Sequence, residues 1–374
     1  MFERPTGGDR ALIVALDFGE GDPAERLAEV DDLARSAGAT VVGTVTGRRQ
    51  RPDAALFAGT GKVDEIAALR VEAGADLVIF NHALSGAQQR NLERKLECRV
   101  VDRVSLILDI FALRARSAEG KLQVELAQVK HQLTRLVGGW THLERQKGGI
   151  GLRGPGETQL ETDRRLLGHR VRALNERLQR VAQQRATQAR TRRKASVRTI
   201  ALVGYTNAGK STLFNRLTGA KAYAADQLFA TLDTTLRRVH VPDADPIVLS
   251  DTVGFIRELP HDLVAAFHAT LAEAAEADLM LHVIDASHPG REEQIAAVEA
   301  VLAEIGADQV PQVRVYNKID ATSLDPGVER DESGIICAVR VSALTGAGCP
   351  DLLAALAERF PGRVPNPARD SVPV

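Results

Sequence analysis

Apolar positions in the first hundred residues occur as short runs separated by longer amphipathic stretches. The runs cover Ala11–Leu16, Thr40–Val45, Asp76–Phe80 and Arg99–Val101. Between them, apolar residues recur at helical spacing over Pro23–Ser36, Lys62–Glu72 and Ser85–Glu97. Because strands alternate with helices, we expect residues 1–103 to form a small parallel α/β domain whose sheet is covered on its faces.

The apolar period changes after residue 103. Apolar residues then recur at alternating steps of four and three, at Val104, Leu108, Phe111, Ala115, Ala118, Leu122, Leu126, Val129, Leu133 and Leu136. This pattern predicts one long helix, in which Gly120 costs about 1 kcal/mol relative to alanine. The same spacing resumes after a glycine-rich break, at Leu160, Leu167, Val171, Leu174, Leu178 and Val181.

Two long amphipathic helices in tandem favour an antiparallel hairpin, because each helix can then bury the apolar stripe of the other. We expect this hairpin over residues 104–197, with a tip loop at about 137–158 and a basic linker helix at its end. The alternative is that each helix packs separately on a globular domain.

Strands and helices alternate again over residues 198–360. The predicted strands are Thr199–Gly204, Ile247–Asp251, Leu279–Asp285, Gln312–Asn317 and Ile336–Ser342. This arrangement is typical of a doubly wound α/β domain. Residues 361–374 hold four prolines and few apolar side chains, which predicts a disordered tail.

The first strand of this domain runs directly into a phosphate-binding motif. Residues 204–211 read G-x-x-x-x-G-K-S, followed by a helical segment, which is the context that a P-loop requires. Backbone N–H groups of such a loop surround the phosphates, and the helix N-terminus adds partial positive charge. We expect Lys210 to reach the β- and γ-phosphates and the Ser211 hydroxyl to bind Mg²⁺. The predicted phosphate-binding residues are Gly204, Tyr205, Thr206, Asn207, Ala208, Gly209, Lys210, Ser211 and Thr212.

A second motif selects guanine. Asn317, Lys318, Ile319 and Asp320 lie at the carboxyl end of the predicted strand that begins at Gln312. The Asp320 carboxylate can accept hydrogen bonds from N1–H and the 2-amino group of guanine. Adenine lacks both donors and would leave the carboxylate unpaired, at a cost of about 1–3 kcal/mol. Asn317 is expected to brace the phosphate loop and Lys318 to lie along the base. Backbone N–H groups for the guanine O6 would come from Ser342, Ala343 and Leu344.

Two further segments are predicted to sense the γ-phosphate. In the first, Asp251 would hold Mg²⁺ through water and the Gly254 N–H would contact the γ-phosphate, with Thr252 and Val253 between them. The other segment lies between Ala222 and Arg237, with Phe229, Ala230, Thr231, Leu232 and Asp233 as its nucleotide-binding residues. Thr231 is the preferred second Mg²⁺ ligand, and Thr234 and Thr235 are alternatives.

Two departures from the Ras pattern bear on catalysis. Ras-like enzymes carry a glutamine after D-x-x-G to orient water, whereas Phe255 stands here and can form no such hydrogen bond. Intrinsic hydrolysis is therefore expected to be slow and stimulated by a partner. Asn207 offers an oxygen within the phosphate loop that could help to hold K⁺ between the phosphates. The catalytic candidates are Lys210, Thr231, Gly254 and Asn207.

These motifs together resemble the translation-associated GTPases, and Gly148–Glu161 resembles the signature of the HflX family among them. The resemblance implies an α/β N-terminal domain, a helical hairpin and a GTPase domain. It also implies binding to the large ribosomal subunit and its RNA in the GTP form, with dissociation or rescue of stalled ribosomes and hydrolysis resetting the switch. Thr231 matches the family's Mg²⁺-binding threonine. The family's N-terminal domain has been credited with ATP binding, and here Gly59–Lys62 is the only local feature like a phosphate loop.

Basic residues gather on the second predicted hairpin helix and the linker. They are Arg164, Arg165, Arg170, Arg172, Arg177, Arg180, Arg185, Arg190, Arg192, Arg193, Lys194 and Arg198. Little acid accompanies them beyond Glu176, which favours contacts with phosphates over a merely solvated face. At the tip loop, Lys147 and Arg153 could contact RNA phosphates. Trp140 and His142 could stack on a base, although packing on the hairpin suits Trp140 better.

Composition sets the remaining expectations. The formal net charge is -1, the three cysteines lack metal-ligand spacing, and no apolar stretch resembles a signal peptide or a membrane span. We therefore expect a cytoplasmic monomer that approaches membranes only through bound ribosomes. Two other functions stay open: a GTP-dependent RNA-modification factor, and an RNA-binding scaffold that retains GTP without turning it over.

Overall fold

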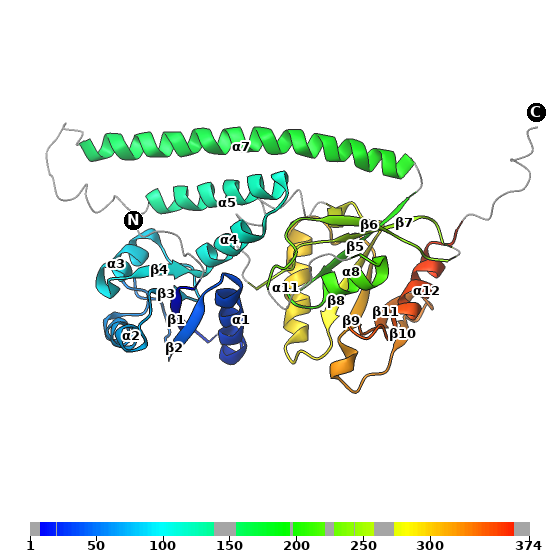
Figure 1. Cartoon of the computed structure of the whole chain (residues 1–374), viewed down its shortest axis with the longest axis horizontal. Coiled ribbons are helices and arrows are strands. Elements are labelled where there is room, and N and C mark those ends of the chain that lie inside the picture. The colour runs from blue at the N-terminus through cyan, green and yellow to red at the C-terminus, as the bar shows by residue number, and fades with distance from the viewer. Residues whose placement is uncertain are drawn as a thin grey trace, which may run out of the picture. The chain divides into compact units, whose positions relative to one another are not determined.

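The computed structural model describes residues 8–19, 21–137, 155–194, 197–220, 228–242, 244–257 and 273–362 (Figure 1). These residues form two compact units. The first unit comprises the described residues up to Arg180 together with Leu228 and Phe229, and the second comprises the rest. The predicted tip residues and tail, including Trp140, His142, Lys147, the Gly148–Arg153 part of the glycine-rich signature and residues 363–374, lie outside the described residues.

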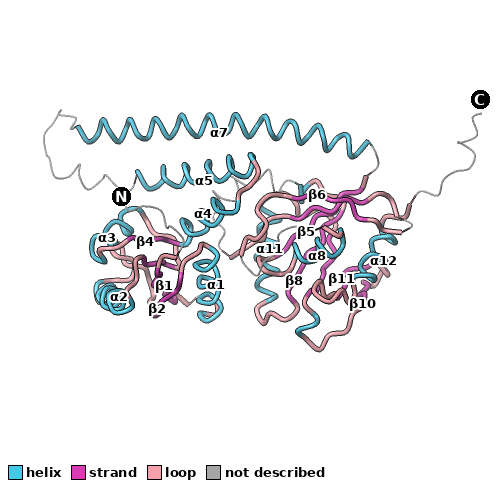
Figure 2. Tube along the Cα trace, in the orientation of Figure 1, coloured by secondary structure: helices cyan, strands magenta, loops and turns pink. Residues whose placement is uncertain are grey.

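The first unit contains a parallel sheet with the strand order β2-β1-β3-β4. Its strands are β1 (Arg10–Asp17), β2 (Thr40–Arg48), β3 (Leu77–Phe80) and β4 (Arg99–Asp102). The connecting helices are α1 (Pro23–Ser36), α2 (Thr60–Ala73) and α3 (Gly86–Leu96). In Figure 2, α1 lies on one side of this sheet, and α2 and α3, which contact each other, lie on the opposite side. The predicted small α/β sheet is therefore confirmed.

The long helix predicted from Val104 to Leu136 is wrong, because the chain forms two helices there. They are α4 (Arg103–Arg114) and α5 (Ala118–Val137). Ala115 leaves the helical conformation with ψ 112°. The next helix then starts from Ser117, whose hydroxyl accepts the Gly120 N–H at 2.8 Å. An N-terminal cap thus restarts the helix without disturbing the apolar period.

α4 packs on the first sheet and on α1, and α5 packs on α7 (Pro155–Lys194). Leu126, Val129 and Leu174 form a small buried cluster between α5 and α7, and four partly buried side chains pack around it: Leu122, Leu167, Val171 and Leu178. The predicted hairpin is confirmed by this shared seam, which Figure 1 shows as two helices side by side. α7 begins at Pro155, earlier than the expected end of the tip loop at residue 158. None of the described helices, α7 included, has an apolar stretch long enough to cross a membrane.

The second unit is a doubly wound α/β domain with the strand order β10-β11-β9-β8-β5-β7-β6. Its strands are β5 (Arg198–Gly204), β6 (Thr235–Val239), β7 (Ile247–Asp251), β8 (Leu279–Asp285), β9 (Gln312–Asn317), β10 (Gly327–Arg330) and β11 (Ile336–Arg340). Its helical segments are α8 (Lys210–Thr218), α11 (Arg291–Glu304), the short turn η1 (Ile319–Ala321) and α12 (Cys349–Arg359). Because β5, β7, β8, β9 and β11 run parallel, their carboxyl ends meet at one edge of the sheet.

The sequence pattern did not predict β6 and β10, which pair antiparallel at the two edges of this sheet. Both carry exposed charged residues where a core strand would carry apolar ones, such as Arg237 and Arg238 in β6. Edge strands need to bury only one side, so their apolar signal is weak. The central strands β7 and β8 are buried along their whole length, and the prediction of their bounds is confirmed.

Candidate functional site

The loop between β5 and α8 has the backbone shape of a phosphate-binding loop. Asn207 and Gly209, on either side of Ala208, adopt left-handed φ values of 59° and 91°. A side chain at Gly209 would place its Cβ 2.2 Å from Asn317 Nδ2, and one at Gly204 would meet the Val283 carbonyl at 2.2 Å. Glycine is therefore required at both ends of the loop because neighbouring groups approach its backbone.

Lys210 opens α8 and its ammonium lies under the loop. Its Nζ donates to the carbonyls of Gly204 at 3.0 Å and Tyr205 at 2.6 Å. Burial lowers the pKa of Lys210 to about 8, and the nearby Asp251 carboxylate opposes this shift. A desolvated ammonium held by two carbonyls is well placed to interact with phosphate oxygens, since its charge is little screened by solvent.

Three oxygen-bearing side chains converge beside Lys210. The Ser211 hydroxyl donates to Asp251 Oδ2 at 2.8 Å and lies 2.7 Å from the Thr231 hydroxyl. The other carboxylate oxygen of Asp251 is buried and has no hydrogen-bond partner among the described residues, and burial raises the pKa of this carboxyl group. Hard oxygen ligands around an unsatisfied carboxylate suit Mg²⁺. Of the three threonines considered, Thr231 is the one that joins Ser211, whereas the Thr234 hydroxyl is buried without a partner in the described chain and Thr235 opens β6.

Asn317 connects the phosphate loop with the base-binding side. Its side-chain amide donates to the Ala208 carbonyl at 2.9 Å, and its side-chain oxygen accepts the Ala343 N–H at 2.9 Å. The Ser342 hydroxyl donates to Asp320, which orients the carboxylate predicted to read guanine. Because these contacts join three separated segments at the carboxyl edge of the sheet, the predicted guanine-binding residues lie together. Leu344 extends from the same loop with a mostly exposed side chain.

Two side chains that support this region were not predicted from the sequence. Asp285, at the end of β8, forms an ion pair with Lys318 at 2.7 Å, and Lys318 has a left-handed φ of 63°. Hydrogen bonds from Lys318 and Ser287 lower the pKa of Asp285, although burial opposes them. Arg216 of α8 donates to the carbonyls of Ala343 and Leu344. The position of Asp285 at the end of the predicted strand Leu279–Asp285 was the signal available in the sequence.

Gly254 passes directly over the phosphate loop. A Cβ at this position would lie 2.9 Å from Thr206 Cγ2 and 3.0 Å from Lys210 Nζ. The Thr252 hydroxyl donates to the Leu202 carbonyl at 2.6 Å and so turns inward instead of toward a ligand. Phe255 is completely buried, and the Val253 side chain is also buried.

Some predicted nucleotide-binding residues use their side chains elsewhere. The Phe229 ring packs edge to face on Phe111 of α4, with centroids 4.6 Å apart, within the first compact unit. Leu232 and Ile319 are buried apolar side chains. For these three, the expected nucleotide contact would have to be made by the backbone. Ala230, Asp233 and Thr212 are partly exposed, and their roles remain predictions.

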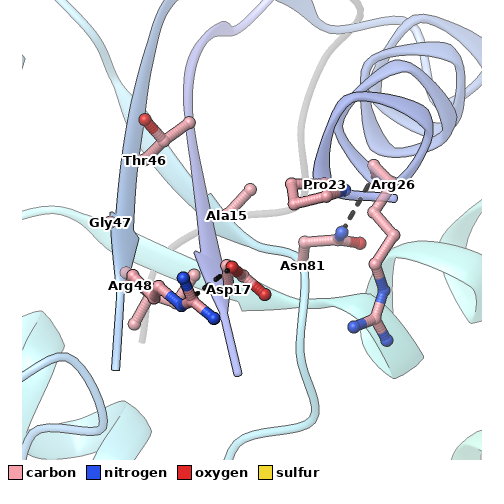
Figure 3. A pocket seen from close by; sticks show the side chains of 9 residues that line it. Ala15, Asp17, Pro23, Arg26, Thr46, Gly47, Arg48 and Asn81 are labelled. Carbon is pink, nitrogen blue, oxygen red and sulfur yellow. Dashed lines mark hydrogen bonds and ion pairs between the residues drawn. The ribbon is translucent and has the colours of Figure 1, made fainter. Parts of the chain in front are cut away.

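The N-terminal segment considered for ATP does not form a phosphate loop. Gly59 is the residue before α2, and a Cβ there would meet the Arg49 guanidinium at 2.1 Å. Lys62 Nζ is already bonded to the Thr46 carbonyl at 3.0 Å and paired with Glu65. A cavity of about 300 Å³ lies elsewhere in this unit, lined by residues at the ends of β1 and β2 and at the start of α1 (Figure 3).

The Asp285–Lys318 pair leads to a testable prediction. Asp285→Asn should weaken binding of GDP and GTP about equally, by roughly tenfold, because Lys318 loses the partner that holds it along the base. The turnover number at saturating GTP should change less than threefold, since Asp285 does not contact the phosphates. Calorimetry and steady-state kinetics measure the two quantities, with the exposed Asp308→Asn as the control. A fall in turnover without a loss of affinity would contradict this role.

Comparisons with known proteins agree with this geometry. Family models described as GTP-binding GTPase N-terminal, GTP-binding GTPase Middle Region and 50S ribosome-binding GTPase match residues 24–112, 114–192 and 199–318. The GTPase HflX of Escherichia coli K12 is 58% identical over 365 residues, which cover 97% of this chain and 86% of that protein. The GTPase HflX of Caldanaerobacter subterraneus is 48% identical over 95% of this chain and 82% of that protein.

A solved structure shows the same fold. The crystal structure of SsGBP and GDP complex aligns with a TM-score of 0.53 and 24% identity, covering 95% of this chain and 98% of that one. Three findings point to one family: the P-loop, the Asn317–Asp320 motif, and the similarity to HflX proteins over almost the whole chain. The chain belongs to the HflX family of GTPases, which hydrolyse GTP to GDP.

Proposed function

We propose that this GTPase binds the large ribosomal subunit in its GTP form and dissociates or rescues stalled ribosomes, with hydrolysis resetting the protein. The description of the family model matched by residues 199–318, a 50S ribosome-binding GTPase, supports the partner. The observation that carries the proposal is the row of exposed arginines on α7, because such a row suits the phosphates of RNA.

Four of these arginines are free to bind phosphate. Arg164, Arg165, Arg177 and Arg180 are exposed and make no ion pair with any described residue. Arg170, on the same helix, pairs with Glu125 of α5 and so helps to hold the hairpin together. Unpaired guanidinium groups need break no ion pair before they bind a polyanion, and each phosphate contact releases counterions.

The bound nucleotide would set the affinity for the ribosome through the two segments predicted to sense the γ-phosphate. Thr231 and Asp251 would hold Mg²⁺, and Gly254 would contact the γ-phosphate, so these contacts exist only with GTP. Mg²⁺ would neutralise charge between the β- and γ-phosphates. A partner that binds the GTP conformation more tightly shifts the population toward it and is released after hydrolysis. A cytoplasmic location follows from this partner.

Hydrolysis is proposed to be slow without the ribosome and to use K⁺. Phe255 is fully buried, so position 255 cannot orient the attacking water. Asn207, in contrast, is exposed on the phosphate loop, where it has a left-handed φ of 59° and carries an amide oxygen. A cation held there would supply positive charge where other GTPases use an arginine.

The cavity in Figure 3 favours a second nucleotide site in the N-terminal unit, for ATP. It opens at the carboxyl ends of β1 and β2 beside Asn81, which follows β3. The connections from β1 and β3 lead to opposite sides of the sheet there, and open α/β sheets bind ligands at such points. Arg26 and Arg48 would contact phosphates and Asp17 a ribose hydroxyl. The volume of about 300 Å³ is at the lower limit for ligand sites, so the base would extend outside.

The two other functions have less support. An RNA-modification enzyme needs a catalytic cluster outside the GTPase site, and the described residues contain no group of three or more His, Cys, Asp or Glu side chains placed to hold a metal. A non-hydrolysing scaffold conflicts with membership of a GTPase family. Turnover measured with purified ribosomes separates the scaffold from the proposed function.

Co-sedimentation with separated ribosomal subunits tests the partner. We expect binding to the large subunit with a non-hydrolysable GTP analogue, at least tenfold weaker binding with GDP, and a steep decrease with salt. Reversing Arg177 and Arg180 to Glu should reduce binding by at least tenfold while GTP affinity stays the same. The same charge change at Arg94 and Lys95 of α3 is the control. Equal binding of the reversed protein would contradict the role of α7.

Deletion of residues 148–156 tests the predicted tip loop; of these residues, 148–154 lie outside the described part of the chain and 155–156 open α7. GTP affinity should be unchanged, because the nucleotide site does not include this segment. Splitting of ribosomes, followed by light scattering, should be lost. If the shortened protein splits ribosomes at the original rate, the tip has no part in the function.

Exchange of monovalent cations tests catalysis. GTP turnover should rise at least fivefold when K⁺ replaces Na⁺ at constant ionic strength, and Asn207→Ala should remove most of that increase. GDP affinity, measured in the same buffers, is the control because the cation is expected to act on the γ-phosphate. Equal rates in both salts would rule out the K⁺ site.

Calorimetry with ATP, in the presence of saturating GDP, tests the N-terminal site. Binding should be weakened at least fivefold by Arg26→Ala combined with Arg48→Ala. Lys62→Ala should have no effect, since Lys62 does not line the cavity. The opposite pattern would assign ATP to the Gly59–Lys62 segment, and the absence of any ATP heat would remove the site.

A further inference from the structure

The segment that follows Gly254 is fixed to the phosphate loop by its backbone. Phe255 forms a parallel bridge with Tyr205. Its N–H donates to the Gly204 carbonyl at 3.1 Å, and its carbonyl accepts the Thr206 N–H at 2.7 Å. Both polar backbone groups of Phe255 are therefore used, and its side chain is wholly buried. Residue 255 thus belongs structurally to the phosphate loop.

The Tyr205 side chain extends this attachment from Phe255 to Arg257. The Arg257 N–H donates to the Tyr205 hydroxyl at 2.9 Å, and Tyr205 itself is only 7% exposed. The Arg257 guanidinium pairs with Glu293, in the first turn of α11, at 2.7 Å. Residues 255–257 are therefore held at one side by the phosphate loop and at the other by α11. The Tyr205 hydroxyl thus links the phosphate loop directly to Arg257.

We propose that Tyr205 is a positioning residue for GTP hydrolysis: its hydroxyl holds the Arg257 amide and so fixes the Gly254 N–H over the γ-phosphate site. Gly254 lies between Asp251, at the end of β7, and the bridged residue Phe255, so its amide direction depends on both neighbours. The close approach of Gly254 to Thr206 and Lys210 leaves little room for error in that direction. A donor aimed at developing charge contributes most when it is fixed before the reaction.

The same contacts bear on the segment that follows D-x-x-G. In Ras-like GTPases the loop after D-x-x-G relaxes when the γ-phosphate is lost. Here residues 255–257 are bonded to the phosphate loop and α11, so these contacts restrain the start of the switch segment. Glycine at 254 serves close approach to the phosphate loop.

The variant Tyr205→Phe tests the proposal because it removes one hydroxyl and leaves the ring. We expect the turnover number for GTP to fall about tenfold, since the partly buried Arg257 N–H loses its acceptor and the Gly254 amide becomes less well fixed. Affinity for GDP should change less than twofold, because GDP has no γ-phosphate. Hydrogen exchange at the Arg257 amide should become at least tenfold faster.

Two further variants keep the test interpretable. Tyr316→Phe, in β9, removes a hydroxyl from the same domain and should leave turnover and Arg257 exchange unchanged. Glu293→Gln weakens the other anchor of Arg257. It should reduce turnover by about two- to threefold, because Glu293 is 59% exposed and its ion pair is partly screened. This variant also tests the proposal if Tyr205→Phe proves unstable.

Two results would overturn the proposal. One is unchanged GTP turnover in Tyr205→Phe together with faster exchange at Arg257, which would show that the contact has no effect on catalysis. The other is an equal loss of GDP affinity and turnover, which would show that Tyr205 only supports the fold of the phosphate loop.

Discussion

The nucleotide site depends on one side chain amide, that of Asn317. Its two hydrogen bonds, to the Ala208 carbonyl and from the Ala343 N–H, join the phosphate-binding loop to the base-binding loop. The amide is buried, so neither bond competes with water and the loss of either would leave an unsatisfied polar group. Close packing of Asn317 against Gly209 explains why that position of the loop cannot carry a side chain. Asn317, at the end of the central strand β9, thus holds the phosphate-binding loop and the base-binding loop at a fixed separation.

Burial of charge is the second constraint. Lys210 and Asp251 are both buried, and burial favours the neutral form of each. It lowers the pKa of Lys210 and raises the pKa of Asp251, whereas the attraction between the two charges opposes both shifts. The free oxygen of Asp251 and the free hydroxyl of Thr206 are unsatisfied in the described chain. Such groups are costly in a fold and are found where a ligand supplies the missing partners. A nucleotide with its metal ion therefore also stabilises the domain, since it binds only the folded state.

Sequence alone predicted the parts that are local in the chain. The phosphate loop, the Asn317–Asp320 motif and the buried strands are encoded by neighbouring residues, so their positions could be predicted before the fold was known. The Asp285–Lys318 pair and the Tyr205–Arg257 hydrogen bond join residues 33 and 52 positions apart, and no spacing rule indicates them. The break between α4 and α5 had a local signal that the apolar period concealed: Ser117 followed by Gly120, whose N–H it caps. The packing of the Phe229 side chain on Phe111 could not be predicted either, because an apolar residue in a predicted binding loop can pack elsewhere.

The contacts between the phosphate loop and residues 255–257 distinguish this protein from Ras-like switches. When residue 255 is a glutamine on a free loop, one segment both senses the γ-phosphate and orients water. Here the bridge between Tyr205 and Phe255 removes residue 255 from the second task, and the first task is the one proposed for Gly254. In that proposal sensing and water activation belong to different groups, so a cation or a partner surface can complete catalysis without loosening the γ-phosphate sensor. In this proposal the fixed Gly254 amide supports hydrolysis but does not orient the attacking water, so full turnover waits for the cation or partner that does.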